Sequence, residues 1–211
     1  MQLDHLTIIA PTLEAGAEHV RNLLGVDMPF GGNHPEMGTH NLLVRLGDDV
    51  FLEVIAIDPA AEGPGRARWF DLSDPAVVKH AWDAGHRLRG WVVRTSNIDT
   101  VLSAHGAILG QKIRVSRGGR IWSFSMPSDG SLPMDGVAPS VIDWGAQGHP
   151  AMTMTNLDLT LVEFVIEHPD PTAVKTLYQR LGLQNPPRIR KGEQHRYRAV
   201  IKTSAGLREL Y

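Results

Sequence analysis

One order of elements, a strand followed by a helix and then more strands, recurs along this chain and limits the folds open to it. The first instance begins at residues 3–10, LDHLTIIA, which alternate in polarity as a strand does. Residues 13–25 then place apolar side chains at helical spacing. Thr12 is suited to cap that helix and Gly25 to end it.

Two more strands complete this first unit. They are HNLLVRL at 40–46 and VFLEVIAI at 50–57, joined by a short turn that begins at Gly47. The glycine- and proline-rich stretch before them predicts a long loop or an irregular strand. We therefore expect residues 1–59 to form a βαβββ module.

The same order returns twice. The sequence NIDT at 97–100 falls over TLEA at 12–15 when the second occurrence is set on the first. In this second copy the helix begins after Asn97 and is expected to end at Gly106, and RIWSFSMP and PSVIDWGA supply strands. We expect a linker at 60–86 with a short helix near 75–84, a second βαβββ module at 87–150, and a shortened β-α-β segment at 151–211 on the same domain.

Paired modules of this kind predict an α+β fold. Neither module covers both faces of its own sheet, so side by side they form one curved mixed sheet with helices outside and a cleft inside. Strand alternation places His5 on the face opposite Leu6 and Ile8, and it places Glu53 opposite Leu52 and Val54. A buried imidazole or carboxylate needs a partner, which for His5 could be Asp4 or a backbone carbonyl and for Glu53 could be Arg45. The pattern therefore predicts that His5 and Glu53 meet in the cleft.

These residues carry a family resemblance. LDHLTIIAPTLEAGAEHVRNLLGV followed by GTHNLLVRLGDDVFLEVIAIDP resembles the first module of the vicinal oxygen chelate superfamily, and more narrowly its glyoxalase-like members. That superfamily includes glyoxalase I, bleomycin-resistance proteins and extradiol dioxygenases. The resemblance implies a divalent metal at the centre of the cleft, with ligands from the first and last strands of each module.

Carried onto this sequence, the resemblance implies His5 and Glu53 as metal ligands. In the second module the first-strand position falls at Gly90 or Trp91, which cannot bind a metal, and the last-strand position falls near Asp143. His40 is the best candidate for a fourth ligand. Alternation groups His40 with residues expected against the helix, but this argument is weak at the first residue of a strand. Imidazole and carboxylate ligands suit Zn, Ni, Mn or Fe(II), and the protein could also hold no metal.

Four further residues are candidates for substrate binding. Asn41 and Arg45 face the cleft by alternation, and Arg45 could hold a substrate carboxylate through two hydrogen bonds. His34 lies on a glycine-rich segment that either closes over the cleft or is a solvent-exposed loop. Trp91 belongs with Trp122 and Trp144 to a group that either lines the cleft with aromatic rings or fills the core.

Composition excludes several other functions. The chain has no cysteine, so disulfides, thiolate metal sites and a cysteine nucleophile are ruled out. A net charge of −2 gives no reason to expect nucleic acid or an anionic membrane as partner. No serine-hydrolase or nucleotide-binding motif is present. We expect a cytoplasmic protein with a small-molecule ligand, either monomeric or a homodimer.

Two functions follow from these features. The first is a metal-dependent glyoxalase-like enzyme, of lyase, isomerase or dioxygenase type, that chelates a small oxygenated substrate. The resemblance to glyoxalase I implies that Glu53 could leave the metal and act as the catalytic base. The alternative is a binding protein of the bleomycin-resistance type, which sequesters a small molecule without chemistry.

Overall fold

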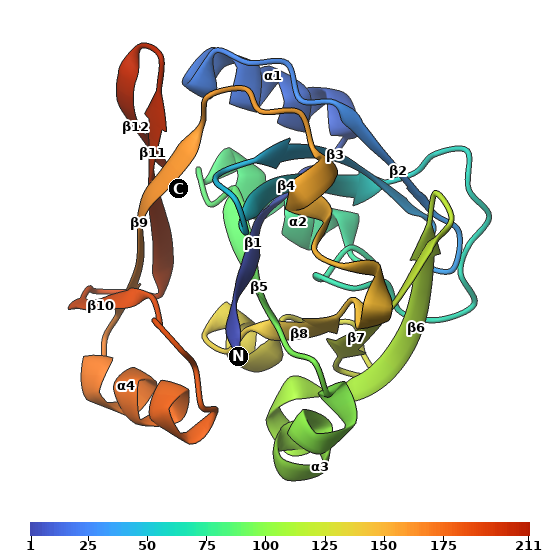
Figure 1. Ribbon diagram of the computed structural model, residues 1–211, viewed down its shortest axis with the longest axis vertical. Coiled ribbons are helices and arrows are strands. Elements are labelled where there is room, and N and C mark those ends of the chain that lie inside the picture. Colours follow the sequence, from blue (N-terminus) through green and yellow to red (C-terminus); the bar gives the residue numbers. More distant parts are fainter.

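A large curved sheet forms most of the molecule. The computed structural model describes residues 1–211 and shows this sheet beside a smaller one (Figure 1). The large sheet has eight strands in the order β2-β3-β4-β1-β5-β8-β7-β6. Its strands are β1 (Gln2–Ile9), β2 (Phe30–His34), β3 (Thr39–Arg45), β4 (Phe51–Ile57), β5 (Leu88–Arg94), β6 (Gln111–Arg117), β7 (Arg120–Met126) and β8 (Ser140–Asp143).

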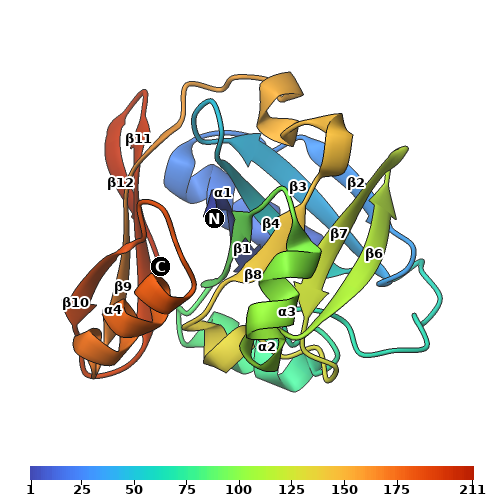
Figure 2. The same cartoon turned by 60° about the horizontal axis from the view of Figure 1, so that its bottom comes forward.

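The two halves of this sheet share one topology. In each half the first strand pairs in parallel with the last, β1 with β4 and β5 with β8. The halves join where β1 and β5 run antiparallel at the centre. At the far edges, β2 and β6 approach each other, so that the sheet curls almost into a barrel, as Figure 2 shows. The α+β fold with a curved mixed sheet is confirmed.

One helix covers each half from outside. Helix α1 (Leu13–Leu24) begins as predicted, because the Thr12 hydroxyl accepts a hydrogen bond from Ala15 N at 3.1 Å. Helix α3 (Ile98–Leu109) does not end at Gly106, where it was predicted to stop. Gly106 is tolerated inside the helix because the additional turn buries Leu109 completely. Gly110 ends the helix with a φ of +85°.

Strand β6 was missed in the sequence. Its Ile113, Val115 and Arg117 face inward, while Lys112 and Arg114 face solvent. This alternation is the ordinary pattern of a strand, so the signal was available in the sequence.

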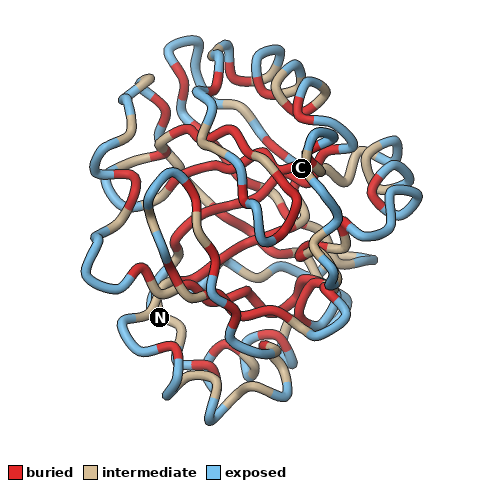
Figure 3. Tube along the Cα trace, turned by 90° about the vertical axis from the view of Figure 1, so that its right-hand side faces the viewer, coloured by how far each residue is buried: buried red, intermediate tan, exposed pale blue.

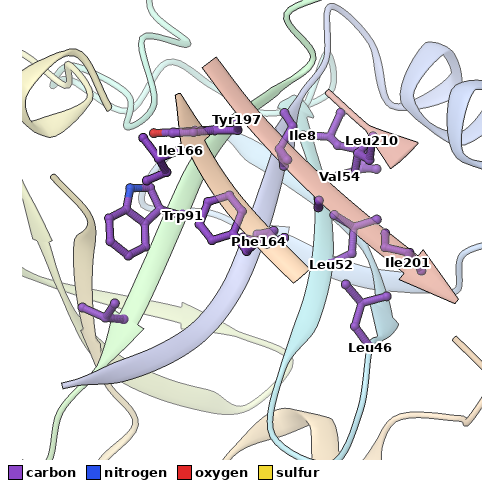
Figure 4. Packing of buried hydrophobic residues seen from close by; sticks show 14 of the residues in the cluster. Ile8, Leu46, Leu52, Val54, Trp91, Phe164, Ile166, Tyr197, Ile201 and Leu210 are labelled. Atoms are coloured by element: carbon purple, nitrogen blue, oxygen red, sulfur yellow. The ribbon is translucent and has the colours of Figure 1, made fainter. Parts of the chain in front are cut away.

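The C-terminal segment forms the smaller sheet, in the order β10-β9-β11-β12. Its elements are β9 (Thr160–His168), α4 (Pro171–Arg180), β10 (Arg188–Lys191), β11 (Arg196–Thr203) and β12 (Gly206–Leu210). This sheet packs on the outer face of the large sheet, where the ring centroid of Trp91 of β5 lies 5.8 Å from that of Phe164 of β9 (Figure 4). The ring of Tyr178 of α4 lies 5.4 Å from the same Trp91 ring. Backbone hydrogen bonds from Leu161 N to Leu46 O and from Gln184 N to Met1 O tie the two layers together.

Strand alternation divides the buried side chains between two cores. Leu52, Val54 and Ala56 face outward into the larger core beneath the helices and the C-terminal sheet, whereas Phe51 and Ile55 face the concave side. The strands form the buried centre of the molecule, with exposed loops around them (Figure 3). None of the helices has the length and hydrophobicity that crossing a bilayer requires.

Residues 60–86 are not a free linker. Trp69, Phe70 and Leu72 pack into the concave side of the large sheet, and Val78 of helix α2 (Pro75–Asp83) joins them. Three short 3-10 helices lie in the connections that follow β7: η1 (Pro133–Gly136) precedes β8, and η2 (Gly145–Gln147) and η3 (Pro150–Thr153) follow it. The open cleft expected from the sequence is therefore mostly filled by side chains.

Candidate functional site

A β-bulge directs two ionisable residues of β1 into the concave side. The pairing of β1 with β5 passes from Leu3 opposite Val93 to His5 opposite Val92, and Asp4 has no opposite partner. An extra residue of this kind re-aims the neighbouring side chains. Asp4 and His5 are consequently both buried, with exposed fractions of 0% and 4%.

Asp4 anchors this group of side chains. One carboxylate oxygen lies 2.6 Å from His5 Nδ1, and the other accepts a hydrogen bond from Trp144 Nε1 at 2.9 Å. His149 Nε2 also lies 3.1 Å from Asp4 Oδ2, at an angle that is poor for a hydrogen bond. Burial raises the pKa of Asp4, but the nearby His149 and His5 outweigh it and hold the pKa well below its ordinary value.

Glu53 of β4 lies on the other side of the imidazole. Its Oε2 is 3.5 Å from His5 Nε2 and 3.4 Å from the Thr7 hydroxyl, and its Oε1 accepts a hydrogen bond from Asn41 Nδ2 at 2.6 Å. Burial raises the pKa of Glu53, but the hydrogen bond and charge of His5 lower it below its usual range. Burial lowers the pKa of His5, yet Asp4 and Glu53 together raise it to about 9. At neutral pH the pair is therefore an imidazolium beside a carboxylate.

His34 and Arg117 complete the polar set. His34 Nδ1 is 3.1 Å from the Thr39 hydroxyl, and burial lowers the pKa of His34 to about 4, so this ring is neutral. Arg117, at the end of β6, is only 8% exposed and lies over the Trp122 ring, with its Cζ 5.5 Å from the ring centroid. One buried cation from β6 and one neutral imidazole from β2 thus line the same cavity as Glu53.

These side chains surround an inner cavity of about 20 Å³, enough for one water molecule. Its lining consists of a few polar groups among aromatic rings: His5, His34, Phe51, Glu53, Trp69, Phe70, Arg117, Trp122, Phe124, Ile142 and Trp144. A wider outer groove of about 340 Å³ adjoins it, and Arg117 lines both. Phe30, Leu43, Arg120 and Met154 also line the groove.

The structure brings His5, Glu53, Asn41 and His34 together, but four other predicted residues lie elsewhere. The Asp143 carboxylate accepts hydrogen bonds from Ile98 N and Gly145 N, so it caps the start of α3. His40 opposes Ala56 of the outer core, on the helix-covered side. Strand alternation had grouped His40 with the helix-covered side, and this grouping holds even at the start of the strand.

Arg45 and Trp91 are the other two corrections. Arg45 donates to Gly47 O at 2.7 Å and pairs with Asp48, because the tight β3–β4 turn brings both within reach. Trp91 faces the outer core, where its Nε1 donates to Gly136 O at 3.0 Å. The inward neighbours of Trp91 on β5 are Gly90 and Val92.

Several residues of the site were not predicted. Arg117 follows from the alternation of β6, and Trp122 and Trp144 were named only as part of an aromatic group. Trp69 and Phe70 belong to the supposed linker, and nothing local in the sequence shows that they enter the cavity.

The donor set does not fit a resident divalent metal. No three His, Asp or Glu side chains converge on one point, whereas catalytic zinc sites, for example, use three protein ligands. The second module supplies no metal ligand. At its first-strand position, a Cβ on Gly90 would lie 3.0 Å from Thr7 Cβ and 3.6 Å from Phe70, so there is no room for a side chain. At its last-strand position, the apolar Ile142 lines the cavity. The predicted set of His5, Glu53, His40 and Asp143 does not form.

Comparison with known protein families shows to which family this chain belongs. A family model described as a glyoxalase-like domain matches residues 3–182. The chain belongs to this family. The glyoxalase-like resemblance predicted from the sequence is therefore confirmed. Comparison with curated protein sequences gives no match.

Solved structures extend the likeness of this glyoxalase-like protein to its whole fold. A hypothetical protein from Staphylococcus aureus aligns with a TM-score of 0.66 at 13% identity, covering 100% of this chain and 98% of the other. Methylmalonyl-CoA epimerase from Mycobacterium tuberculosis aligns at 0.43 and 16% identity, covering 67% and 86%. The Streptomyces coelicolor epimerase in complex with 2-nitronate-propionyl-CoA aligns at 0.43 and 18% identity, covering 70% and 96%.

Proposed function

We propose that this glyoxalase-like protein is an isomerase or lyase that moves a proton on a small oxygenated substrate. The observation that carries the proposal is the buried Glu53 carboxylate, which lies beside the His5 imidazolium and borders the inner cavity. Perturbed ionisable groups that line a cavity are candidates for acid–base catalysis.

The arrangement suits removal of a proton next to a carbonyl group. Glu53 is ionised at neutral pH and so can accept the proton. The electron pair of the broken C–H bond moves to the carbonyl oxygen and forms an enolate, which is an enediolate where the carbon that loses the proton carries a hydroxyl group. The charges of His5 and Arg117 face the same cavity and would stabilise that oxyanion once Glu53 has been neutralised.

Entry of a substrate requires movement at the wall of the cavity, because about 20 Å³ holds only a water molecule. Phe70 and Asp71 both have left-handed backbones, with φ of 58° and 59°, which ordinary residues adopt only under strain. The Asp71 carboxylate accepts a hydrogen bond from Arg89 at 3.1 Å and holds this segment against the sheet. We infer that residues 69–71 are the part of the wall that moves.

A hydrogen-exchange experiment tests the proposal. The protein is incubated in D₂O with hydroxyacetone, dihydroxyacetone and the hemithioacetal of methylglyoxal, and loss of the carbon-bound proton signal is followed by NMR. We expect wild-type protein to catalyse exchange on at least one of them. Glu53→Gln should lower the rate by about 10²–10⁴-fold, as expected for loss of a general base. Glu163→Gln, which changes a carboxylate of the C-terminal sheet, should not change it.

The binding protein remains the second candidate, because the second module contributes apolar or absent side chains where the first contributes His5 and Glu53. Binding of these compounds without exchange in wild-type protein would favour it. Elemental analysis of protein purified without chelator addresses the metal separately. One equivalent of metal, lost in His5→Ala, would show that solvent or substrate completes a site the side chains leave open.

A further inference from the structure

Arg117 is a buried cation without a counter-ion. Its side chain makes no hydrogen bond or ion pair, although every other arginine whose side chain is largely buried within a sheet has such a partner. The charge of Glu53 acts on Arg117, but the two side chains lie beyond ion-pair distance, and Glu53 is engaged by His5 and Asn41. Burying an unpaired charge is costly. Such a residue therefore calls for a ligand that supplies the missing charge.

The fold holds Arg117 in place at some cost. Its aliphatic chain crosses from β6 to the facing edge of β2, where a Cβ on Gly32 would come within 2.7 Å of Arg117 Cγ. The φ of Gly32 is +139°, so both the space and the backbone there require glycine. The guanidinium also stacks near Trp122. The orientation of the cation is thus fixed before any ligand arrives, which favours tight binding.

The surroundings define what the ligand can be. Arg117 separates the inner cavity from the outer groove. No acidic residue lines the groove, and a second cation, Arg120, stands at its rim. Phe30, Leu43 and Met154 give the groove an apolar wall. An anion at Arg117 would therefore have one end beside His5 and Glu53 and the other beside apolar side chains.

We propose that Arg117 binds the carboxylate of an apolar 2-oxo or 2-hydroxy acid, whose adjacent oxygenated carbon lies toward His5 and Glu53. The planar guanidinium matches a carboxylate through two parallel hydrogen bonds. This inference rests on the proposed function for its choice of the reacting carbon. It gives to Arg117 the role that the sequence had suggested for Arg45.

Calorimetry with a matched pair of compounds tests the proposal. Benzoylformate carries the carboxylate, and methyl benzoylformate has nearly the same shape without the charge. We expect wild-type protein to bind the acid about 10- to 100-fold more tightly than the ester, as charge-assisted hydrogen bonds predict. Arg117→Met should remove that preference and leave ester binding within about twofold. Arg117→Lys should keep part of it, and the control Arg45→Gln should keep all of it.

Stability gives an independent readout of folding. Without ligand, Arg117→Met should unfold at a higher temperature than wild type, because the variant no longer buries an unpaired charge. Equal binding of acid and ester by wild type, no binding of the acid at millimolar concentration, or unchanged acid binding by Arg117→Met would each overturn the inference. Binding of inorganic phosphate as tight as that of benzoylformate would also overturn the inference, since the site would then recognise negative charge in general and not a carboxylate.

Failure of the proposed function would look different. Glu53→Gln should bind benzoylformate at least as tightly as wild type, since it removes a negative charge from the cavity. If it does so while wild-type protein exchanges no proton on any substrate tested, the anion site stands and the catalytic proposal fails.

Discussion

Replacement of Asp4 by asparagine tests whether the buried charges act as one unit. The Asp4 carboxylate contacts His5 Nδ1, Trp144 Nε1 and His149 Nε2 at 2.6, 2.9 and 3.1 Å. An asparagine in the same place has no charge, and it has one acceptor oxygen where the carboxylate has two. Breaking a buried pair by removing one partner costs about 3–5 kcal/mol. We expect a loss of unfolding free energy of that order at pH 6.5.

The pH dependence of the unfolding free energy gives a more specific prediction than the loss at a single pH. His5 has a pKa of about 9 in the folded protein, whereas its ordinary value, taken here for the unfolded chain, is 6.5. Because the folded pKa is the higher one, the stabilisation is fully present below pH 6.5 and is lost as pH rises toward 9. At about 1.36 kcal/mol for each pH unit, wild-type protein should lose about 3 kcal/mol across this window. His19, His34 and His195 have pKa values lowered to about 4, mainly by burial, so in the folded protein they stay neutral throughout this window. In the unfolded chain each of them is half protonated at pH 6.5, which offsets about 1 kcal/mol of the loss.

Urea unfolding at pH 6.5 and pH 9.0 measures both effects. In Asp4→Asn the hydrogen bond that most raises the pKa of His5 is gone, so the loss between the two pH values should fall to less than half of that in wild type. The control Asp27→Asn changes an exposed carboxylate paired with Arg21 and should reproduce the wild-type slope. Equal slopes in wild type and Asp4→Asn would refute the reasoning. If the variant does not fold, a flat wild-type profile from pH 6.5 to 9.0 would refute it as well.

Two further substitutions test the packing around the site. Gly110→Ala should cost about 2–4 kcal/mol in thermal or urea unfolding, because its Cβ would lie 2.2 Å from the Met126 backbone and its φ is +85°; a cost below 1 kcal/mol would contradict the described end of α3. Tyr178→Phe should cost about 1–3 kcal/mol by leaving Val137 O without its 2.7 Å hydrogen bond, and a neutral result would mean that water replaces the hydroxyl.

Local patterns were enough to predict the fold and the centre of the site. Alternation in β1 and β4 placed His5 and Glu53 on one face, and the parallel pairing of these strands then set Thr7 beside Glu53. The caps of α1 could be predicted because Thr12 and Gly25 each bond to a residue within about one turn of the helix end. Each of these inferences depends on residues close together in the sequence or on a repeated strand order.

The rest of the site depends on features that local patterns do not contain. The bulge at Asp4 arises from pairing with β5, so alternation in β1 alone places Asp4 on the wrong face. Trp69 and Phe70 enter the cavity through a loop whose path is set by contacts with β5 and β7. Asp143 was expected to face the cleft, but Ile142 does so instead. A difference of one residue in a strand exchanges its two faces.

The central position of β1 has a consequence for the order of folding. Among the strands of the large sheet β1 is synthesised before the others, yet its neighbours are β4 and β5, and the indole that bonds Asp4 belongs to Trp144. Until residue 144 has left the ribosome, Asp4, His5 and Glu53 remain hydrated, and their desolvation is deferred to the last steps of assembly. Such long-range pairing slows folding, so the nascent N-terminal half has the longest wait for its partners and is the part of the chain that most needs protection from aggregation.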